Sequence, residues 1–432
     1  MNLFIKGVIC FLVFSCFSIP RQESVIANPS EIPHEQLNTQ QQVSVLPDAE
    51  KVKSNLTHHD SGVEIEVYPS YGYASEYGVF LGVGATVEDY AFKTEPYRYR
   101  MQLDGGAASA NDIRYKLHYS GDFRTLIKNT SLFVEAGTSG LDIIHFYGLG
   151  NENYFNGMGL EEKDFEVLNQ VTSLKASLSY PMDTIYKWSA GVDAKWVGLT
   201  LKPGSFNDLH RVEVPGINTD FAGSITLGFH YDSRDSGDAI EQLSRNQKSN
   251  PASQGSTTAL SGILLNLEGK YYPEFFGNQN TYGKISGDFR SYIPLVSSRY
   301  SRVVFRFGGE KIWGEYPFYE AAFLGGSTSL RGYDKQRFAG DASLYAGSEL
   351  RLYMGTFNLF VPVKYGPLFF AETGRVFLDG ENSDAWHTGA GGGLWFSLLE
   401  SRYTASIAYG RGFDNGRLLN DYGIYVRTEF SF

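Results

Sequence analysis

Apolar and polar side chains alternate with a period of two residues along most of this 432-residue chain, from about residue 63 to the end. The last segment shows the pattern most clearly, with one face formed by Tyr422, Ile424, Val426, Thr428, Phe430 and Phe432. Because neighbouring residues of a strand point to opposite faces, this period predicts strands with one apolar and one polar side. The sequence beyond residue 63 has no sustained helical period and no apolar run of about 18 residues, so helical membrane spans are excluded.

The alternating segments run to about ten residues, the length that a tilted strand needs to cross a bilayer. Each unpaired peptide group in hydrocarbon costs several kcal/mol, so spanning strands have to close into a ring. We therefore predict an all-β fold, a transmembrane antiparallel β-barrel of about sixteen strands. The predicted strands start near residues 63, 78, 96, 112, 130, 166, 187, 218, 258, 281, 302, 341, 366, 388, 401 and 422.

Composition supports this fold and excludes several functions. Aromatic residues make up 15% of the chain and Gly is abundant at 48 residues, as expected for β structure. A net charge of −11 without a run of Lys or Arg excludes nucleic acid as a partner. Serine-nucleophile elbows, zinc-binding helices and phosphate-binding loops are absent from the sequence. We therefore expect no enzyme activity, cofactor or metal, and a solvated role for His58 and His59.

The N-terminus has the features of an export signal. Lys6 precedes an apolar stretch, and Ala27 ends a site suited to signal peptidase, which predicts a signal peptide over residues 1–27. Cleavage as a lipoprotein before Cys16 is an alternative, which the bulky Phe14 disfavours. Residues 28–62 are rich in Gln, Asn, Ser and Pro, and we expect a disordered periplasmic linker there. Residues 63–432 then form the barrel.

The sequence GGSTSLRGY lies at residues 325–333, between the eleventh and twelfth predicted strands. It resembles the signature of the sixth extracellular loop in the superfamily of BamA, TamA and the two-partner-secretion transporters, also called the bacterial surface antigen family. This resemblance implies that the loop folds back into the lumen. It also implies that Arg331, with Gly332 and Tyr333 at the tip, docks on acidic residues of the inner wall.

Two downstream glutamates match the acidic partners of that family. Glu349, in Ser-Glu-Leu-Arg, resembles the glutamate of the twelfth strand, and our strand register turns it inward. Glu372, in Phe-Ala-Glu-Thr-Gly, stands where the thirteenth strand of the family has Asp. A guanidinium held away from water needs carboxylates beside it, and Arg binds them bidentately. The alternative is that both carboxylates simply face water in the lumen.

Other segments also resemble the family. The hexapeptide Phe-Tyr-Gly-Leu-Gly-Asn at 146–151 is similar to a segment of related barrel domains. Residues 231–235 and 251–255 together resemble a periplasmic turn of the family with extra residues between its halves. Gly423, Phe430 and Phe432 resemble the C-terminal sorting signal read by the outer-membrane assembly machinery. This machinery is the expected partner in biogenesis, and the expected location is the Gram-negative outer membrane, with the barrel integral in its lipid.

The resemblance implies translocation or insertion of protein or lipid at the outer membrane. Family members that handle polypeptides carry periplasmic POTRA domains, and residues 28–62 are too few to form one. An unidentified periplasmic partner that replaces those domains is therefore one expectation. The alternative function is a passive pore or structural membrane anchor that has lost the transport machinery. The sequence leaves the substrate open.

Overall fold

The computed structural model describes residues 62–74, 78–90, 97–109, 113–152, 162–181, 185–210, 214–234, 261–296, 298–358, 361–398, 403–414 and 417–427. The predicted signal peptide and all but the last residue of the predicted linker lie outside these ranges. Phe430 and Phe432 of the predicted sorting signal also lie outside these ranges. The expectation that no POTRA domain precedes the barrel concerns residues 28–62, of which only residue 62 is described.

The main sheet contains seventeen strands. They are β1 (Gly62–Ala74), β2 (Gly78–Tyr90), β3 (Tyr99–Ser109), β4 (Ile113–Ile127), β5 (Thr130–His145), β6 (Glu166–Tyr180), β7 (Tyr186–Leu201), β8 (Phe221–Asp232), β9 (Gly262–Tyr272), β10 (Tyr282–Leu295), β11 (Ser298–Gly314), β14 (Ala342–Arg351), β15 (Gly355–Asn358), β16 (Pro362–Phe377), β17 (His387–Leu398), β18 (Tyr403–Asp414) and β19 (Arg417–Arg427). The connections hold α3 (Phe206–Leu209), β12 (Ala322–Leu324), β13 (Phe338–Gly340) and the 3-10 turns η1 (Glu162–Asp164), η4 (Glu274–Phe276) and η5 (Phe318–Glu320).

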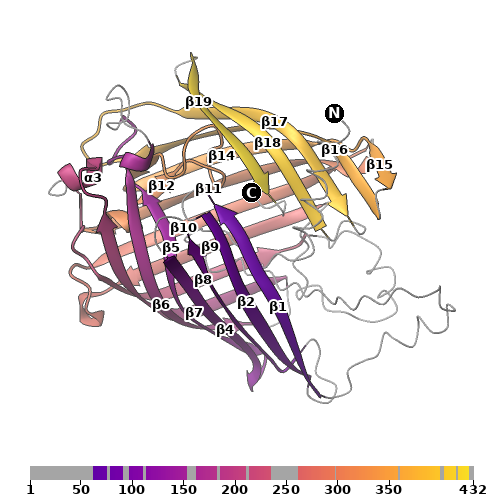
Figure 1. The fold of residues 1–432 in the computed structure, drawn as a ribbon, viewed down its shortest axis with the longest axis horizontal. Helices are drawn as coiled ribbons and strands as arrows, with labels where there is room; N and C mark the ends of the chain where they lie inside the picture. The colour runs from indigo at the N-terminus through magenta and orange to yellow at the C-terminus, as the bar shows by residue number, and fades with distance from the viewer. Residues whose placement is uncertain are drawn as a thin grey trace.

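Each wall strand pairs antiparallel with the next one along the chain, and the sheet curves into a barrel (Figure 1). β15 continues β14 along the same neighbour, β16, so the seventeen strands make sixteen passes of the wall. This confirms the predicted all-β barrel and its strand number. The observed strands also begin near the predicted positions, and the largest difference, at β19, is residue 417 against residue 422.

The two faces of the wall differ as the alternation predicts. In β19, Tyr422, Ile424 and Val426 are exposed on the outer face, at 58–66% of their full area. In β11, Phe305 is exposed on the outside while its neighbour Val304 is fully buried on the inside. Such an apolar outer band suits hydrocarbon, as in outer-membrane barrels. Among the described residues, no helix is long and apolar enough to cross a membrane.

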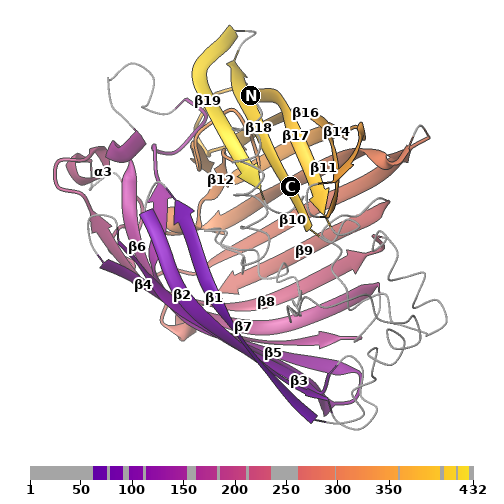
Figure 2. The same ribbon diagram turned by 45° about the vertical axis from the view of Figure 1, so that its right-hand side comes forward.

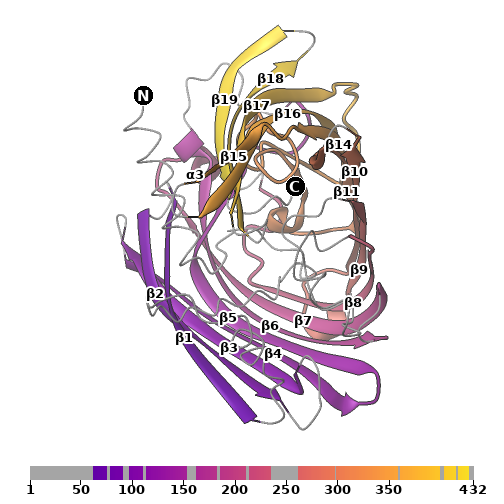
Figure 3. The same cartoon turned by 90° about the vertical axis from the view of Figure 1, so that its right-hand side faces the viewer.

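One seam interrupts the wall. Within the described ranges, β1 pairs with β2 and β19 pairs with β18, and no ladder joins β1 to β19. Figures 2 and 3 show these two strands standing apart. The described ladders therefore run along the whole wall from β1 to β19, and we call the gap between these two strands the seam.

The connections that follow β5, β7 and β11 pack together at one end of the barrel, as expected for turns after odd-numbered strands. Their shared apolar core consists of Ile144, Phe146, Val167, Val197, Val214, Phe318, Tyr319, Ala321 and Ala339. At the opposite end, Arg234 binds both carboxylate oxygens of Asp232 in the predicted periplasmic turn, at 2.9 and 2.8 Å. Residues 235–260, which include the second half of that turn and the extra residues between its halves, lie outside the described ranges.

Candidate functional site

The connection between β11 and β14, residues 315–341, runs inside the barrel and is called loop 6 below. It forms η5 and then a short hairpin of β12 and β13, which lies within the curve of the wall (Figure 2). The tip between the two hairpin strands is held by a buried apolar cluster in which Leu324, Leu330 and Phe338 of the loop pack with Val376 of β16. This packing fixes the tip against the inner face of β16.

Arg331 lies at the tip between two wall carboxylates. Its Nη1 donates to Oε2 of Glu349 at 2.7 Å, and its Nε donates to Oε1 of Glu372 at 2.7 Å. Its backbone N–H also donates to Glu372, at 2.6 Å. The guanidinium carbon stands 3.6 Å from the ring centre of Phe370, which belongs to β16 and is the ladder partner of Glu349. The structure thus brings the predicted arginine and both predicted partners together.

The ion pairs are deeply buried, since Arg331 and Glu349 are 2% exposed and Glu372 is 5% exposed. Burial by itself lowers the pKa of Arg331, but Glu372 and then Glu349 outweigh it and hold this pKa above its ordinary value. Glu349 also accepts a hydrogen bond from Arg351 at 2.6 Å, so it lies between two guanidinium groups. Removing one partner from such a buried set costs about 3–5 kcal/mol, because an uncompensated charge remains.

Gly332 and Tyr333 carry the tip onward to the last two strands. Gly332 has φ +101°, and a Cβ there would overlap the backbone of Arg411 in β18, so only glycine fits. Its N–H donates to the hydroxyl of Tyr425 in β19 at 2.6 Å. Tyr333 donates its own hydroxyl to Asp414 at the end of β18, at 2.5 Å. The tip is therefore bonded to the strand that forms one side of the seam.

Two glycines of the wall make room for this arrangement. A Cβ at Gly389 of β17 would overlap the carbonyl oxygen of Arg331, so the wall approaches the tip backbone to backbone. A Cβ at Gly423 would overlap the side chain of Tyr425, which lies across this position. Gly423, predicted as part of a sorting signal, thus also leaves space for the tyrosine that binds the loop tip.

A model of the Omp85 superfamily domain matches residues 153–412. This chain belongs to the Omp85 superfamily. The matched range includes all of loop 6, both glutamates and Gly389. The resemblance to the superfamily of BamA, TamA and the two-partner-secretion transporters is confirmed, and the fold is that of an outer-membrane β-barrel.

Two solved structures are similar to this Omp85 barrel. BamA from Haemophilus ducreyi lacking POTRA domains 1-3 superposes with a TM-score of 0.54 and 15% identity, over 84% of this chain and 69% of that one. CdiB from Escherichia coli gives a TM-score of 0.50 and 13% identity, over 86% of this chain and 62% of that one. The present chain thus spans less than two thirds of CdiB, and likeness at these identities concerns the fold alone. No curated protein sequence matches the chain.

A second attachment of loop 6 in this Omp85 barrel was missed from sequence. Glu320 of η5 reaches the wall, where it accepts from Lys195 of β7 at 2.7 Å and from Tyr272 of β9 at 3.3 Å. Burial by itself raises the pKa of Glu320, but Lys195 and then Lys284 outweigh it and lower this pKa to about 2. The carboxylate is therefore charged at neutral pH and fixes the base of the loop.

The segment after β5, with its hexapeptide Phe-Tyr-Gly-Leu-Gly-Asn, crosses over loop 6. Gly150 donates its N–H to the carbonyl of Ala339 in β13 at 2.8 Å. Asn151 bonds both backbone groups of Val376 in β16, at 2.7 and 3.0 Å. This segment therefore ties the hairpin of loop 6 to the wall, and the glycine-rich hexapeptide was its visible signal in the sequence.

Proposed function

We propose that this Omp85 barrel translocates or inserts protein or lipid at the Gram-negative outer membrane, with the seam between β1 and β19 as the exit. One observation carries the proposal: the loop tip that holds Arg331 between Glu349 and Glu372 is also hydrogen-bonded to β19 through Tyr425. A movement of β19 at the seam therefore strains the tip, and release of the tip frees β19. Loop 6 is in this way a brace for one edge of the seam.

The proposed partners are lipid, the assembly machinery and a periplasmic protein. The apolar outer face binds outer-membrane lipid, and the C-terminal signal with Gly423 is read by the assembly machinery during biogenesis. An unidentified periplasmic partner delivers the substrate to the end of the barrel opposite the packed loops. We propose no enzymatic step and no cofactor, because the charged residues of the site are all used to hold the loop.

The test is to lock the seam. Cysteine pairs are placed in β1 and β19 over several registers, and the pair that forms a complete disulfide is studied in a strain that lacks the native gene. We expect the oxidised variant to behave as the deletion strain in outer-membrane protein content and detergent sensitivity, and reduction to restore function. The matched control joins Leu265 and Phe289, which already face each other in the β9–β10 ladder, and should be silent.

A locked seam that leaves both phenotypes at the wild-type level would contradict the proposal. In that case the alternative function holds, and the barrel is a passive pore or membrane anchor. That alternative expects steady conductance in planar bilayers, larger after deletion of residues 318–338 and independent of any partner. The two outcomes are distinguishable because the seam disulfide does not alter the lumen that carries a passive current.

A further inference from the structure

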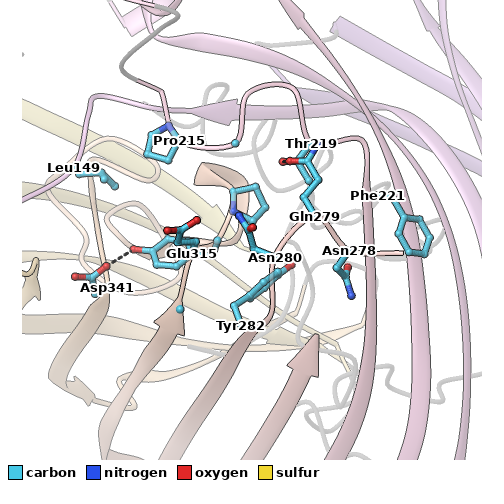
Figure 4. Close-up of a pocket in the computed structure, with 14 residues that line it drawn as sticks. Leu149, Pro215, Thr219, Phe221, Asn278, Gln279, Asn280, Tyr282, Glu315 and Asp341 are labelled. Carbon is cyan, nitrogen blue, oxygen red and sulfur yellow. Dashed lines mark hydrogen bonds between the residues drawn. The ribbon is translucent and has the colours of Figure 1, made fainter. Parts of the chain in front are cut away.

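A cavity of about 420 Å³ opens at the end of the barrel where loop 6 begins (Figure 4). This volume is within the range of small-molecule sites. Its lining comes from the connections that follow β5, β7, β9 and β11, from the ends of β8, β10 and β11, and from the residue between β13 and β14. It includes Pro215, Thr219, Phe221, Gln279, Asn280, Glu315, Tyr316 and Asp341.

Hydrogen bonds between these connections fix the shape of the cavity. Thr219 donates to the side-chain oxygen of Gln279 at 2.8 Å, which joins the β7–β8 and β9–β10 connections. Tyr316 donates to Asp341 at 2.6 Å, and a dashed line at Asp341 marks this bond in Figure 4. The N–H of Phe318 donates to the carbonyl of Pro215 at 2.8 Å. Bonds across separate connections preorganise the walls, which lowers the cost of binding.

The polar groups that remain point to a ligand without negative charge. The lining contains no Lys, Arg or His, and it contains the carboxylates of Glu315 and Asp341. Asp341 is occupied by Tyr316 and by the N–H of Asp379. The side chains of Asn280 and Glu315 and the amide nitrogen of Gln279 are exposed, and their hydrogen-bonding capacity is unused by other described residues. Amides offer both donors and acceptors to a hydroxyl.

We propose that this cavity binds a neutral sugar residue of a polysaccharide. The half-buried ring of Tyr316 offers an apolar face to the C–H face of a pyranose, while Gln279 and Asn280 bond its hydroxyls. Phosphorylated or carboxylated sugars are excluded because no cation balances their charge next to Glu315. If loop 6 lies on the cell exterior, as the proposed function requires, the cavity faces the saccharide layer of the outer leaflet.

The experiment measures binding of methyl glucoside, methyl galactoside and methyl N-acetylglucosaminide to the full chain by saturation-transfer NMR. The detergent must carry no sugar, since a maltoside would compete. We expect at least one glycoside to bind, and the double variant Gln279→Ala with Asn280→Ala to weaken binding at least about fivefold through two lost hydrogen bonds. Phe275→Ala, on the exposed turn beside the cavity, is the matched control and should bind as the parent does.

The variant Glu315→Gln distinguishes binding of a neutral ligand from binding of a cation. The substitution keeps an acceptor and removes the charge, so a glycoside should bind within about threefold of the parent affinity. The proposal is overturned if no glycoside binds, or if binding is equal in the double variant. It is also overturned if tetramethylammonium or inorganic phosphate occupies the cavity instead. These results are independent of the seam, because none of the substituted residues belongs to β1 or β19.

Discussion

Loop 6 is attached to the wall at two places, and the charged wall residues have different partners at each. At the tip, the positive Arg331 enters a pair of glutamates, and Glu372 has no other ion-pair partner among the described residues. At the base, the negative Glu320 pairs with Lys195, and the two further lysines near it have carboxylates of their own. Lys284 pairs with Glu310 at 2.7 Å, and Lys270 pairs with Asp193 at 3.2 Å. The wall thus depends on the loop for charge balance at the tip and much less at the base.

The largest expected effect is that of Arg331→Ala. It leaves the two buried carboxylates of Glu349 and Glu372 without the guanidinium that lies between them, which should cost about 3–5 kcal/mol of unfolding free energy. Urea unfolding of the barrel in lipid vesicles measures this cost, and protease cleavage within residues 318–338 reports release of the loop. Arg331→Lys keeps the charge but lacks the separate nitrogens that donate to the two glutamates, so its cost should lie between zero and the cost of Arg331→Ala. A cost under about 1 kcal/mol for Arg331→Ala would remove the difference between the two attachments.

A smaller effect is expected at the base. Glu320→Gln removes the charge that faces Lys195 while Lys270 and Lys284 retain their wall partners, so we expect a cost of about 2 kcal/mol in the same assay. Glu315→Gln, on the exposed start of the same loop, is the matched control and should change stability by less than about 0.5 kcal/mol. A Glu320→Gln cost equal to that of Arg331→Ala would mean that the lysines depend on the loop after all.

The attachment at the base should also be sensitive to acid. The pKa of Glu320 is lowered from its ordinary 4.5 to about 2, so its contribution is present above pH 4.5 and is lost as the pH falls through about 2. The difference in unfolding free energy between the parent and Glu320→Gln should therefore shrink over this window. The measurement is the same unfolding assay at a series of pH values, and a difference that stays constant down to pH 2 would contradict the assignment.

The sequence predicted the wall and one attachment of the loop. The alternation of apolar and polar residues located the strand starts, because it shows within each strand which side chains face lipid. The tip attachment followed from a motif, Arg-Gly-Tyr, with two glutamates in strands of known inward phase. Glu320 belongs to no such motif, because the sequence Tyr-Glu-Ala is typical of an ordinary loop. Its side chain becomes buried only when η5 contacts lysines of β7, β9 and β10.

Contacts between distant parts of the chain were also beyond sequence reasoning. Tyr425 lies 93 residues from Gly332, and Asn151 lies 225 residues from Val376. No local period encodes such pairs, since they depend on how far the hairpin of loop 6 reaches across the lumen. The rule that every spanning strand needs two neighbours predicts a complete ring, and it gives no register for a pairing of the first strand with the last.

The smallest expected effect links the tip to the seam. Tyr425→Phe removes the acceptor for the N–H of Gly332 and should cost about 1 kcal/mol. We expect faster amide hydrogen exchange at Gly332 and more frequent opening of β19, with the amides of β9 and β10 unchanged. Unaltered exchange at Gly332 would show that the tip is held by its glutamates without help from the last strand.

The contact between Arg331 and Glu372 is tested most directly by a double-mutant cycle of Arg331→Ala and Glu372→Ala in the unfolding assay. If the guanidinium lies between the wall carboxylates, each single substitution strands a buried charge and the double variant recovers part of the loss, with a coupling of at least about 2 kcal/mol. Additive costs, with a coupling below about 0.5 kcal/mol, would show that the arginine is not docked there.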